Sequence, residues 1–285
     1  MTGLFRYHFM TNALEAGTVV AVLAGAIGWF MVLRRQAFAG HTLAVVSFPG
    51  AAGALLLGLG ATAGYFAGAL GAALVIAAVP RAGADGSRSR ESAVIGTVQA
   101  FALACGVLFV SLYGGFLNGL TGLLFGTFLG VSDPQVLTLV VVAAGSLALL
   151  AAVGRPLFFA TVDPDVARVR GVPERLLSTA FLVLLGGAAA EASQITGTLL
   201  VFALLVMPAA AAQRVTSRPG LSLALTLVLA VLTAWLGLGI AYYSVYPVGF
   251  FLTTVGLAFY LAAAAAGWAL DGRGRRPRRV PVPAS

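Results

Sequence analysis

Apolar runs of membrane-spanning length alternate with short polar segments along almost the whole chain. These runs continue for about 20 residues, the length of helix that crosses the hydrocarbon core of a bilayer, and lack the strict alternation of a barrel strand. The pattern predicts an all-α, polytopic membrane protein with about nine transmembrane helices. The predicted spans cover residues 14–33, 43–59, 64–79, 93–112, 136–153, 176–190, 195–212, 221–240 and 249–270.

The stretch from residue 113 to residue 135 does not fit this pattern. It is apolar, but threonine, serine, asparagine and glycine interrupt it in quick succession. We therefore expect a short re-entrant or interfacial helix on the outer side, which ends at Asp133-Pro134. Because this stretch is ambiguous, the number of spans can lie between about eight and about ten.

The composition agrees with a membrane protein, and the charges predict its orientation. Hydrophobic residues make up 60% of the 285 residues and charged residues only 9%, whereas soluble domains are about 25% charged. The 17 basic residues are all arginines, and an odd number of crossings puts every one except Arg6 on the same side. Since basic residues concentrate in cytoplasmic segments, the N-terminus is expected outside and the C-terminus in the cytoplasm. The net charge of +8 therefore reflects topology, and we expect no nucleic-acid partner.

This topology divides the chain into three parts. Residues 1–12 form a short external tail, residues 13–270 form the transmembrane domain, and residues 271–285 form a basic, proline-rich cytoplasmic tail that can attract anionic lipid. The chain contains no lysine, so it cannot carry the GxxxxGK[ST] loop that binds nucleotide phosphates. If ATP drives this protein, another subunit binds the ATP.

The segment 155–175 is the largest predicted cytoplasmic feature. Its middle can form a short helix, because Asp163 suits the N-cap, Pro164 the first helical position and Gly171 the stop. A helix of about two turns is not stable alone in water, so it needs a packing partner. A partner protein is one source of that packing, and an ordinary capped loop is the alternative.

The stretch MVLRRQAFAGHTLAVVSFPG, residues 31–50, carries the first candidate functional residues. Arg34 and Arg35 mark the cytoplasmic end of the first span, and Pro49-Gly50 is expected to break the second helix early. Broken helices in transporters lie where the substrate passes, so we place Ser47, Pro49 and Gly50 on a translocation pathway. His41 is a candidate pathway residue and metal ligand, because imidazole binds first-row metals; the alternative is a loop or interface histidine.

Few other polar groups lie within the predicted spans. Glu191, with Gln194 close by, sits near the outer end of the sixth predicted span and can line a cation pathway or can simply reach the interface. Pro208 lies inside the seventh predicted span and is expected to kink it. Gln99, Asn118 and Thr121 offer further oxygen atoms, but the sequence does not select them.

Four segments in order resemble the ABC-3 family of permeases, which import divalent zinc, manganese or iron. The first matches the family pattern at Val32, Leu33, Arg34, Arg35, Ala37, Phe38, Gly40, Leu43, Pro49 and Gly50, and the others lie at 124–132, 163–172 and 197–212. His41 stands where the family has an aspartate, and Val45 where it has a histidine. The metal chemistry of the family therefore does not carry over intact.

The resemblance implies a set of partners and a set of coupling residues. It implies a homodimer of permeases in a prokaryotic plasma membrane, two cytoplasmic ATPase subunits and an extracytoplasmic metal-binding protein. It also implies that Asp163, Pro164, Arg168 and Gly171 dock on the ATPase. No cofactor is expected on this chain, because the divalent metal is the transported substrate.

The sequence therefore predicts the permease subunit of an ATP-driven importer for a divalent metal, with zinc as the first expectation and manganese or iron next. A permease of the same architecture for a metal chelate or another small solute is an alternative, motivated by His41 and Val45. An ion-coupled secondary transporter is a further alternative, but such proteins usually carry mid-helix acids. The chain has no paired carboxylates, HExxH or nucleophile-with-base spacing, so we do not expect an enzyme.

Overall fold

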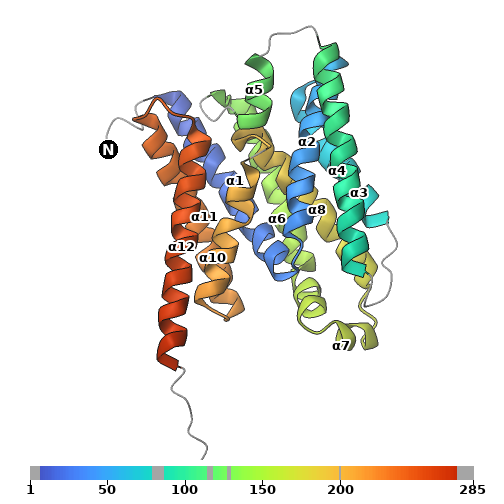
Figure 1. Cartoon of the computed structure of the whole chain (residues 1–285), viewed down its shortest axis with the longest axis vertical. Coiled ribbons are helices and arrows are strands. Elements are labelled where there is room, and N and C mark those ends of the chain that lie inside the picture. Colours follow the sequence, from blue (N-terminus) through green and yellow to red (C-terminus); the bar gives the residue numbers. More distant parts are fainter. Residues whose placement is uncertain (1–6, 79–86, 114–117, 127–129, 199, 275–285) are drawn as a thin grey trace, which may run out of the picture.

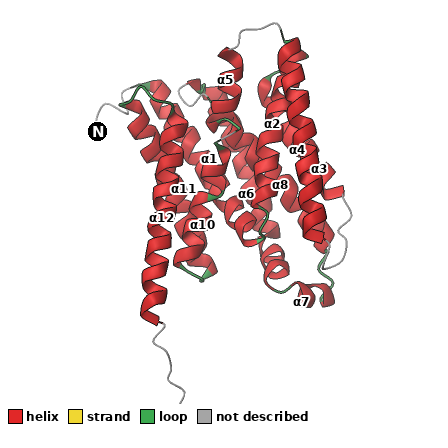
Figure 2. Ribbon diagram, viewed as in Figure 1, coloured by secondary structure: helices red, strands yellow, loops and turns green. Residues whose placement is uncertain are grey.

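A computed structural model describes residues 7–78, 87–113, 118–126, 130–198 and 200–274 of the chain. These residues form helices and connecting segments without strands (Figure 2). The helices are α1 (His8–Leu33), α2 (Ala37–Leu56), α3 (Ala61–Ala78), α4 (Ser87–Leu112), α5 (Asn118–Phe125), α6 (Asp133–Val162), α7 (Pro164–Val169), α8 (Glu174–Thr196), α9 (Val201–Leu205), α10 (Met207–Val215), α11 (Pro219–Tyr242) and α12 (Val248–Gly274).

The predicted all-α membrane fold is confirmed. Within the described residues, eight helices are long and apolar enough to cross a membrane: α1, α2, α3, α4, α6, α8, α11 and α12. The remaining predicted span is the shorter apolar stretch Val201–Val215, which is divided between α9 and α10. The ambiguous stretch contains α5, which lies at the upper end of the bundle, whereas α7 lies at the lower end (Figure 1).

Several predicted boundaries differ from the structure. Helix α1 begins at His8, inside the expected external tail, and α6 continues to Val162, so residues 155–162 of the expected coupling loop are helical. Asp133-Pro134 was expected to end the preceding segment, but Asp133 is the first residue of α6. Pro134 suits this position because proline is favoured in the first turn of a helix. The remainder of the N-terminal tail (1–6), part of the loop 80–91 (79–86) and most of the basic tail (275–285) lie outside the described residues.

The core of the bundle is formed by α1, α2 and α8, which are mostly buried. Helix α8 contacts α1, α2, α3, α5, α6 and α9, so it occupies the centre of the described structure. In contrast, α4, α6 and α12 expose large apolar side chains such as Phe101, Leu137 and Phe250. Exposed apolar side chains on spanning helices suit a hydrocarbon environment.

The expected break of the second helix at Pro49-Gly50 is wrong, because α2 runs unbroken from Ala37 to Leu56 with Pro49 inside it. Proline removes one backbone hydrogen bond, but neighbouring helices make this loss tolerable in a membrane. Here Phe48 and Pro49 pack closely against Gly106 of α4. On the other side, a Cβ atom at Gly50 would collide with the carbonyl oxygen of Gly64 in α3. Packing from α3 and α4 therefore holds α2 helical through the proline.

The chain is broken instead after α8. Gly197 ends α8 with a φ of 77°, a left-handed conformation that favours glycine, and a Cβ atom at this position would collide with the carbonyl oxygen of Leu124. Five residues of α9 follow, and the helix is interrupted again at Val206 before α10 begins. The irregular backbone of this bundle therefore lies between α8 and α10.

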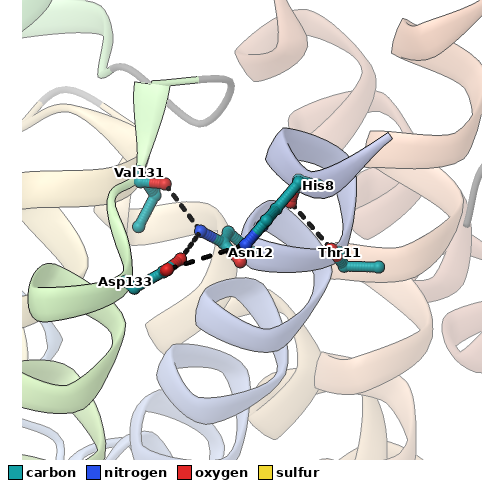
Figure 3. A network of polar contacts seen from close by, with 5 residues as sticks. All are labelled: His8, Thr11, Asn12, Val131 and Asp133. Atoms are coloured by element: carbon teal, nitrogen blue, oxygen red, sulfur yellow. Dashed lines mark hydrogen bonds and ion pairs between the residues drawn. The ribbon is translucent and has the colours of Figure 1, made fainter. Parts of the chain in front are cut away.

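A polar cluster joins the beginnings of α1 and α6 (Figure 3). The side-chain amide of Asn12 donates to the carbonyl oxygen of Val131 at 3.2 Å and to Oδ1 of Asp133 at 2.5 Å. Nε2 of His8 lies 3.6 Å from Oδ2 of Asp133. His8 is thus an exposed partner in a contact between helices.

Candidate functional site

Glu191 is the most isolated ionisable side chain in the described core. It lies in the central helix α8 and is fully buried, and neither of its carboxylate oxygens has a hydrogen-bond partner. Burying a charged carboxylate without a partner costs several kcal/mol, unless a cation, a proton or water compensates it. The surroundings of Glu191 are therefore incomplete without such a group.

The polar side chains that follow Glu191 hydrogen-bond to their own helix. Oγ of Ser193 donates to the carbonyl of Ala189 at 2.6 Å, Nε2 of Gln194 to that of Ala190 at 3.4 Å, and Oγ1 of Thr196 to that of Ala192 at 2.9 Å. A hydroxyl that donates to the backbone keeps lone pairs for another partner. The last turns of α8 thus carry polar side chains whose oxygen atoms can still accept another partner.

His41 lies in the second turn of α2 and is partly exposed. Its ring packs edge to face against Phe202 of α9, with 5.7 Å between the ring centroids. No hydrogen bond or ion pair joins His41 to Glu191 in the described structure. His41 therefore contacts α9, the helix that follows α8 in the chain, and makes no polar interaction with Glu191.

The other candidates on α2 are held by packing and by local hydrogen bonds. Ser47 is fully buried, and its Oγ donates to the carbonyl of Leu43 at 2.9 Å. Pro49 faces α4, and Gly50 faces α3. Because Gly50 allows the backbones of α2 and α3 to approach closely, its role in this structure is helix packing.

The described residues contain no group of three or more histidine, cysteine, aspartate or glutamate side chains that could hold a metal ion. A tight zinc site usually has three or four such ligands. Within the described residues, Glu191 and His41 therefore do not belong to a ligand set of that kind.

Pro208 stands just after a break in the helix. Val206, two residues earlier, has φ −104° and ψ −49°, and α10 begins at Met207 with the proline in its first turn. A proline ring clashes with the carbonyl four residues before it, so a continuous helix through this position is unfavourable. The proline therefore occupies the position in α10 that it suits best.

Helix α7 has the caps that the sequence predicts. The side chain of Asp163 accepts a hydrogen bond from the backbone N–H of Val166 at 3.1 Å, Pro164 opens the helix, and Gly171 has a φ of 72°. Arg168 lies 3.6 Å from Asp165 and 3.8 Å from Glu174, the first residue of α8. The exposed helix α7 is thus tied to the beginning of the helix that carries Glu191.

Three contacts at this site could not be read from the sequence. In the sequence Phe202 is an ordinary apolar residue, and nothing marks it as the partner of His41. The hydrogen bond from Thr42 to Gln99, 2.8 Å long, joins α2 to α4, and the two residues lie 57 positions apart in the chain. Arg34 was only a topology marker, but it donates to Thr161 and Ser178 and lies over the ring of Phe181. A partly buried arginine that hydrogen-bonds to α6 and α8 joins the end of α1 to both helices. An arginine that directly follows an apolar run was the one signal available.

A family model, two named relatives and a solved structure each match this chain over most of its length. A family model described as the ABC 3 transport family matches residues 6–267. The manganese transport system membrane protein MntC of Halalkalibacterium halodurans is 30% identical over 242 residues, which are 85% of this chain and 80% of that protein. The chelated iron transport system membrane protein YfeC of Yersinia pestis is 28% identical over 259 residues, 91% of this chain and 86% of that protein. Among solved structures, PsaBC from Streptococcus pneumoniae in complex with Fab has a chain that matches with a TM-score of 0.83 and 27% identity, over 95% of this chain and 98% of that one.

Proposed function

The chain belongs to the ABC 3 transport family, and we propose that it conducts divalent manganese, or iron(II), through an ATP-driven importer. It is a multi-pass membrane permease subunit and not an enzyme, and ATP hydrolysis belongs to a separate subunit. The relatives named above are transport proteins for manganese and for chelated iron, which supports this choice of metal.

The observation that carries the proposal is the buried, unpartnered carboxylate of Glu191. Its neighbours offer oxygen atoms from Ser193, Gln194 and Thr196, and His41 offers one imidazole. Carboxylate, carbonyl and hydroxyl oxygens suit manganese, whereas zinc prefers sets of imidazole and thiolate ligands. We therefore place manganese and iron(II) before zinc, which was the first expectation from the sequence.

The orientation and the partners are part of the proposal. The arginine-bearing end of the bundle, where α7 lies, faces the cytoplasm of a prokaryotic plasma membrane, because basic residues are retained there. Two copies of the permease, two ATPase subunits and an extracytoplasmic metal-binding protein make up the importer. Asp163, Pro164, Arg168 and Gly171 shape the surface on which the ATPase docks, and exposed Val169 adds an apolar contact.

The structure suggests how movement of the ATPase would reach the pathway. Closure of the ATPase subunits pushes on α7, and the contact between Arg168 and Glu174 transmits this push to the base of α8. Helix α8 then moves Glu191 relative to α9, because Gly197 and Val206 interrupt the chain on either side of that short helix. In this mechanism the hinge is the α8–α10 segment, whereas α2 moves as a rigid helix.

Cellular metal content tests the proposal. A strain that lacks the gene is compared in metal-poor medium with strains that carry the wild type or Glu191→Gln, and manganese, iron, zinc, cobalt and nickel are measured by mass spectrometry. We expect manganese or iron to fall on deletion and to return with the wild type but not with Glu191→Gln. A change in zinc alone would contradict the choice of metal, and no change in any metal would contradict import of free ions.

A chelate importer is the second candidate, favoured by His41 and Val45 at the two positions where the family has metal-handling residues. A pathway for a chelate does not depend on a single imidazole. His41→Ala therefore leaves chelate uptake unchanged, whereas it lowers the uptake of a free ion. Uptake of free manganese and of a ferric chelate, measured in the same cells, separates the two.

A further inference from the structure

The lower part of α12 and the last turn of α10 line an open notch of about 500 Å³, formed by Arg214, Ala264, Ala265 and Trp268. Ala264 and Trp268 are spaced four residues apart, so they lie along one face of α12, and Tyr260 lies one turn before them on the same face. The side chain of Trp268 is 86% exposed, so this notch faces outward from the bundle.

Arg214 reaches over this notch from the last turn of α10. Its Cζ atom lies 5.1 Å from the centroid of the Tyr260 ring, and its side chain lines the hollow. Within the described residues, no carboxylate lies within ion-pair distance of Arg214. A cation–π contact orients the guanidinium but does not neutralise it. Among the described side chains, none therefore neutralises Arg214, and an open hollow lies beside its charge.

The notch lies at the level where a membrane protein meets lipid headgroups. The apolar span of α12 ends at Trp268, and Arg214 lies in the last turn of the apolar stretch Val201–Val215. Helices α10 and α12 touch at this level, since a Cβ atom on Gly267 would lie 3.3 Å from the carbonyl oxygen of Arg214. Tryptophan and arginine at the end of a span are typical of the interface between hydrocarbon and headgroups.

We propose that this notch, lined by Arg214, Ala264, Ala265 and Trp268, binds the headgroup of an anionic phospholipid. The guanidinium pairs with the lipid phosphate, since it has five donors that match phosphate oxygens. Further up α12, Leu257 and Leu261 are exposed on a spanning helix, and they form an apolar surface along which an acyl chain lies. This apolar surface next to the charge is what favours a phospholipid over a soluble phosphate.

The test compares two lipids and three variants of the purified full-length chain. Phosphatidylglycerol and phosphatidylcholine with identical acyl chains are titrated in detergent, and bound lipid is counted by native mass spectrometry. One arginine near an anionic headgroup contributes about a fivefold preference, so we expect the wild type to bind phosphatidylglycerol at least about fivefold more tightly than phosphatidylcholine. Arg214→Gln lowers this preference about fivefold, whereas the contribution of the basic tail is the same in every variant. Ala264→Leu keeps the charge but fills the hollow, and it lowers the preference to the same extent.

Arg218→Gln is the matched control, because Arg218 is an exposed arginine four residues further on and outside the notch. It keeps the wild-type preference. Three results would overturn the proposal: equal affinities of the wild type for both lipids, an equal loss in Arg218→Gln, or an unchanged preference in Ala264→Leu. Competition by millimolar inorganic phosphate shows whether the notch binds a phospholipid or a free phosphate ion. Displacement of the lipid by free phosphate would overturn a phospholipid site.

Discussion

The imidazole ring of His41 meets the ring of Phe202 edge to face, with the ring planes at 87° and the centroids 5.7 Å apart. Phe202 belongs to α9, the short helix between the interruptions at Gly197 and Val206. His41 belongs to α2, which is continuous. The contact therefore joins the rigid helix to the segment that we propose as the hinge, so any movement of α9 changes the surroundings of His41.

This contact predicts that the effects of His41 and Phe202 on transport are not additive. Phe202→Leu removes the aromatic edge that positions the imidazole, a contact of about 0.5–1.5 kcal/mol, and is expected to lower manganese uptake about two- to tenfold. The double variant with His41→Ala should be no slower than His41→Ala alone. Radioactive manganese uptake in cells with matched protein levels measures all three.

Phe250→Leu is the control for this experiment, because Phe250 is exposed on α12 and its ring contact is with Phe251. Its uptake is expected to equal that of the wild type. If the losses in Phe202→Leu and His41→Ala simply multiply in the double variant, Phe202 does not act through the imidazole.

The second prediction concerns the charge of Glu191. Glu191→Gln keeps the shape of the side chain and removes a carboxylate that is fully buried without a partner. Because an unpaired buried charge is costly, the variant should unfold at the same temperature as the wild type or at a higher one. Its manganese uptake should nevertheless fall at least about tenfold, since a neutral amide stabilises a divalent cation far less than a carboxylate does. Thermal unfolding in detergent and uptake in cells are measured on the same protein.

Glu15→Gln provides the matched control, because Glu15 is an exposed carboxylate on another spanning helix. It should change neither the unfolding temperature nor the uptake. Normal uptake by Glu191→Gln would remove Glu191 from the pathway, and a large fall in its unfolding temperature would indicate a structural role for the carboxylate.

The fold was predictable from the sequence because each span is a local property. Runs of apolar residues mark helices wherever they lie in the bundle, and the cap at Asp163 depends only on residues within one turn. The interruption near Pro208 is local for the same reason. These features need no knowledge of which helices are neighbours.

The features that the sequence predicted wrongly, or did not reveal, depend on contacts between helices. Pro49 was expected to break α2, but Gly106 lets α4 pack closely against it, and Gly64 lets α3 approach the neighbouring Gly50. At Gly197 the carbonyl of Leu124 leaves no room for a side chain, which also requires knowledge of the neighbouring segment. The isolation of Glu191 likewise depends on the helices packed against α8, so two equal alternatives remained for this residue at the level of sequence.

The close packing of α2 on α3 leads to a prediction about stability. In Gly50→Ala the new methyl group collides with the backbone of Gly64 and Gly68, which cannot move aside as a flexible side chain would. Overpacking of this kind costs about 1–3 kcal/mol, so the unfolding temperature in detergent should fall clearly.

Gly71→Ala is the matched control on α3, because a methyl group there meets no atom within 4 Å. Alanine is the better helix former, so this control should be neutral or slightly stabilising. Equal unfolding temperatures for the two variants would contradict the packing role of Gly50.

The last prediction tests whether α7 couples the permease to ATP hydrolysis. Asp163→Ala removes the side-chain acceptor that holds the N–H of Val166 at 3.1 Å, which costs about 1 kcal/mol within this short exposed helix. Arg168→Glu removes both ion pairs, including the contact with Glu174 at the base of α8. Both variants should keep the unfolding temperature of the wild type, because α7 lies outside the spanning bundle, and both should lose most of the manganese uptake. Asp163→Asn supplies the control, since asparagine caps a helix about as well as aspartate and should retain transport.

ATP hydrolysis, measured on the reconstituted importer, distinguishes loss of ATPase docking on α7 from loss of transmission through α7. If α7 is a docking surface, Asp163→Ala removes the stimulation of hydrolysis by the substrate-loaded binding protein, whereas full stimulation with normal uptake would show that α7 is only a capped loop.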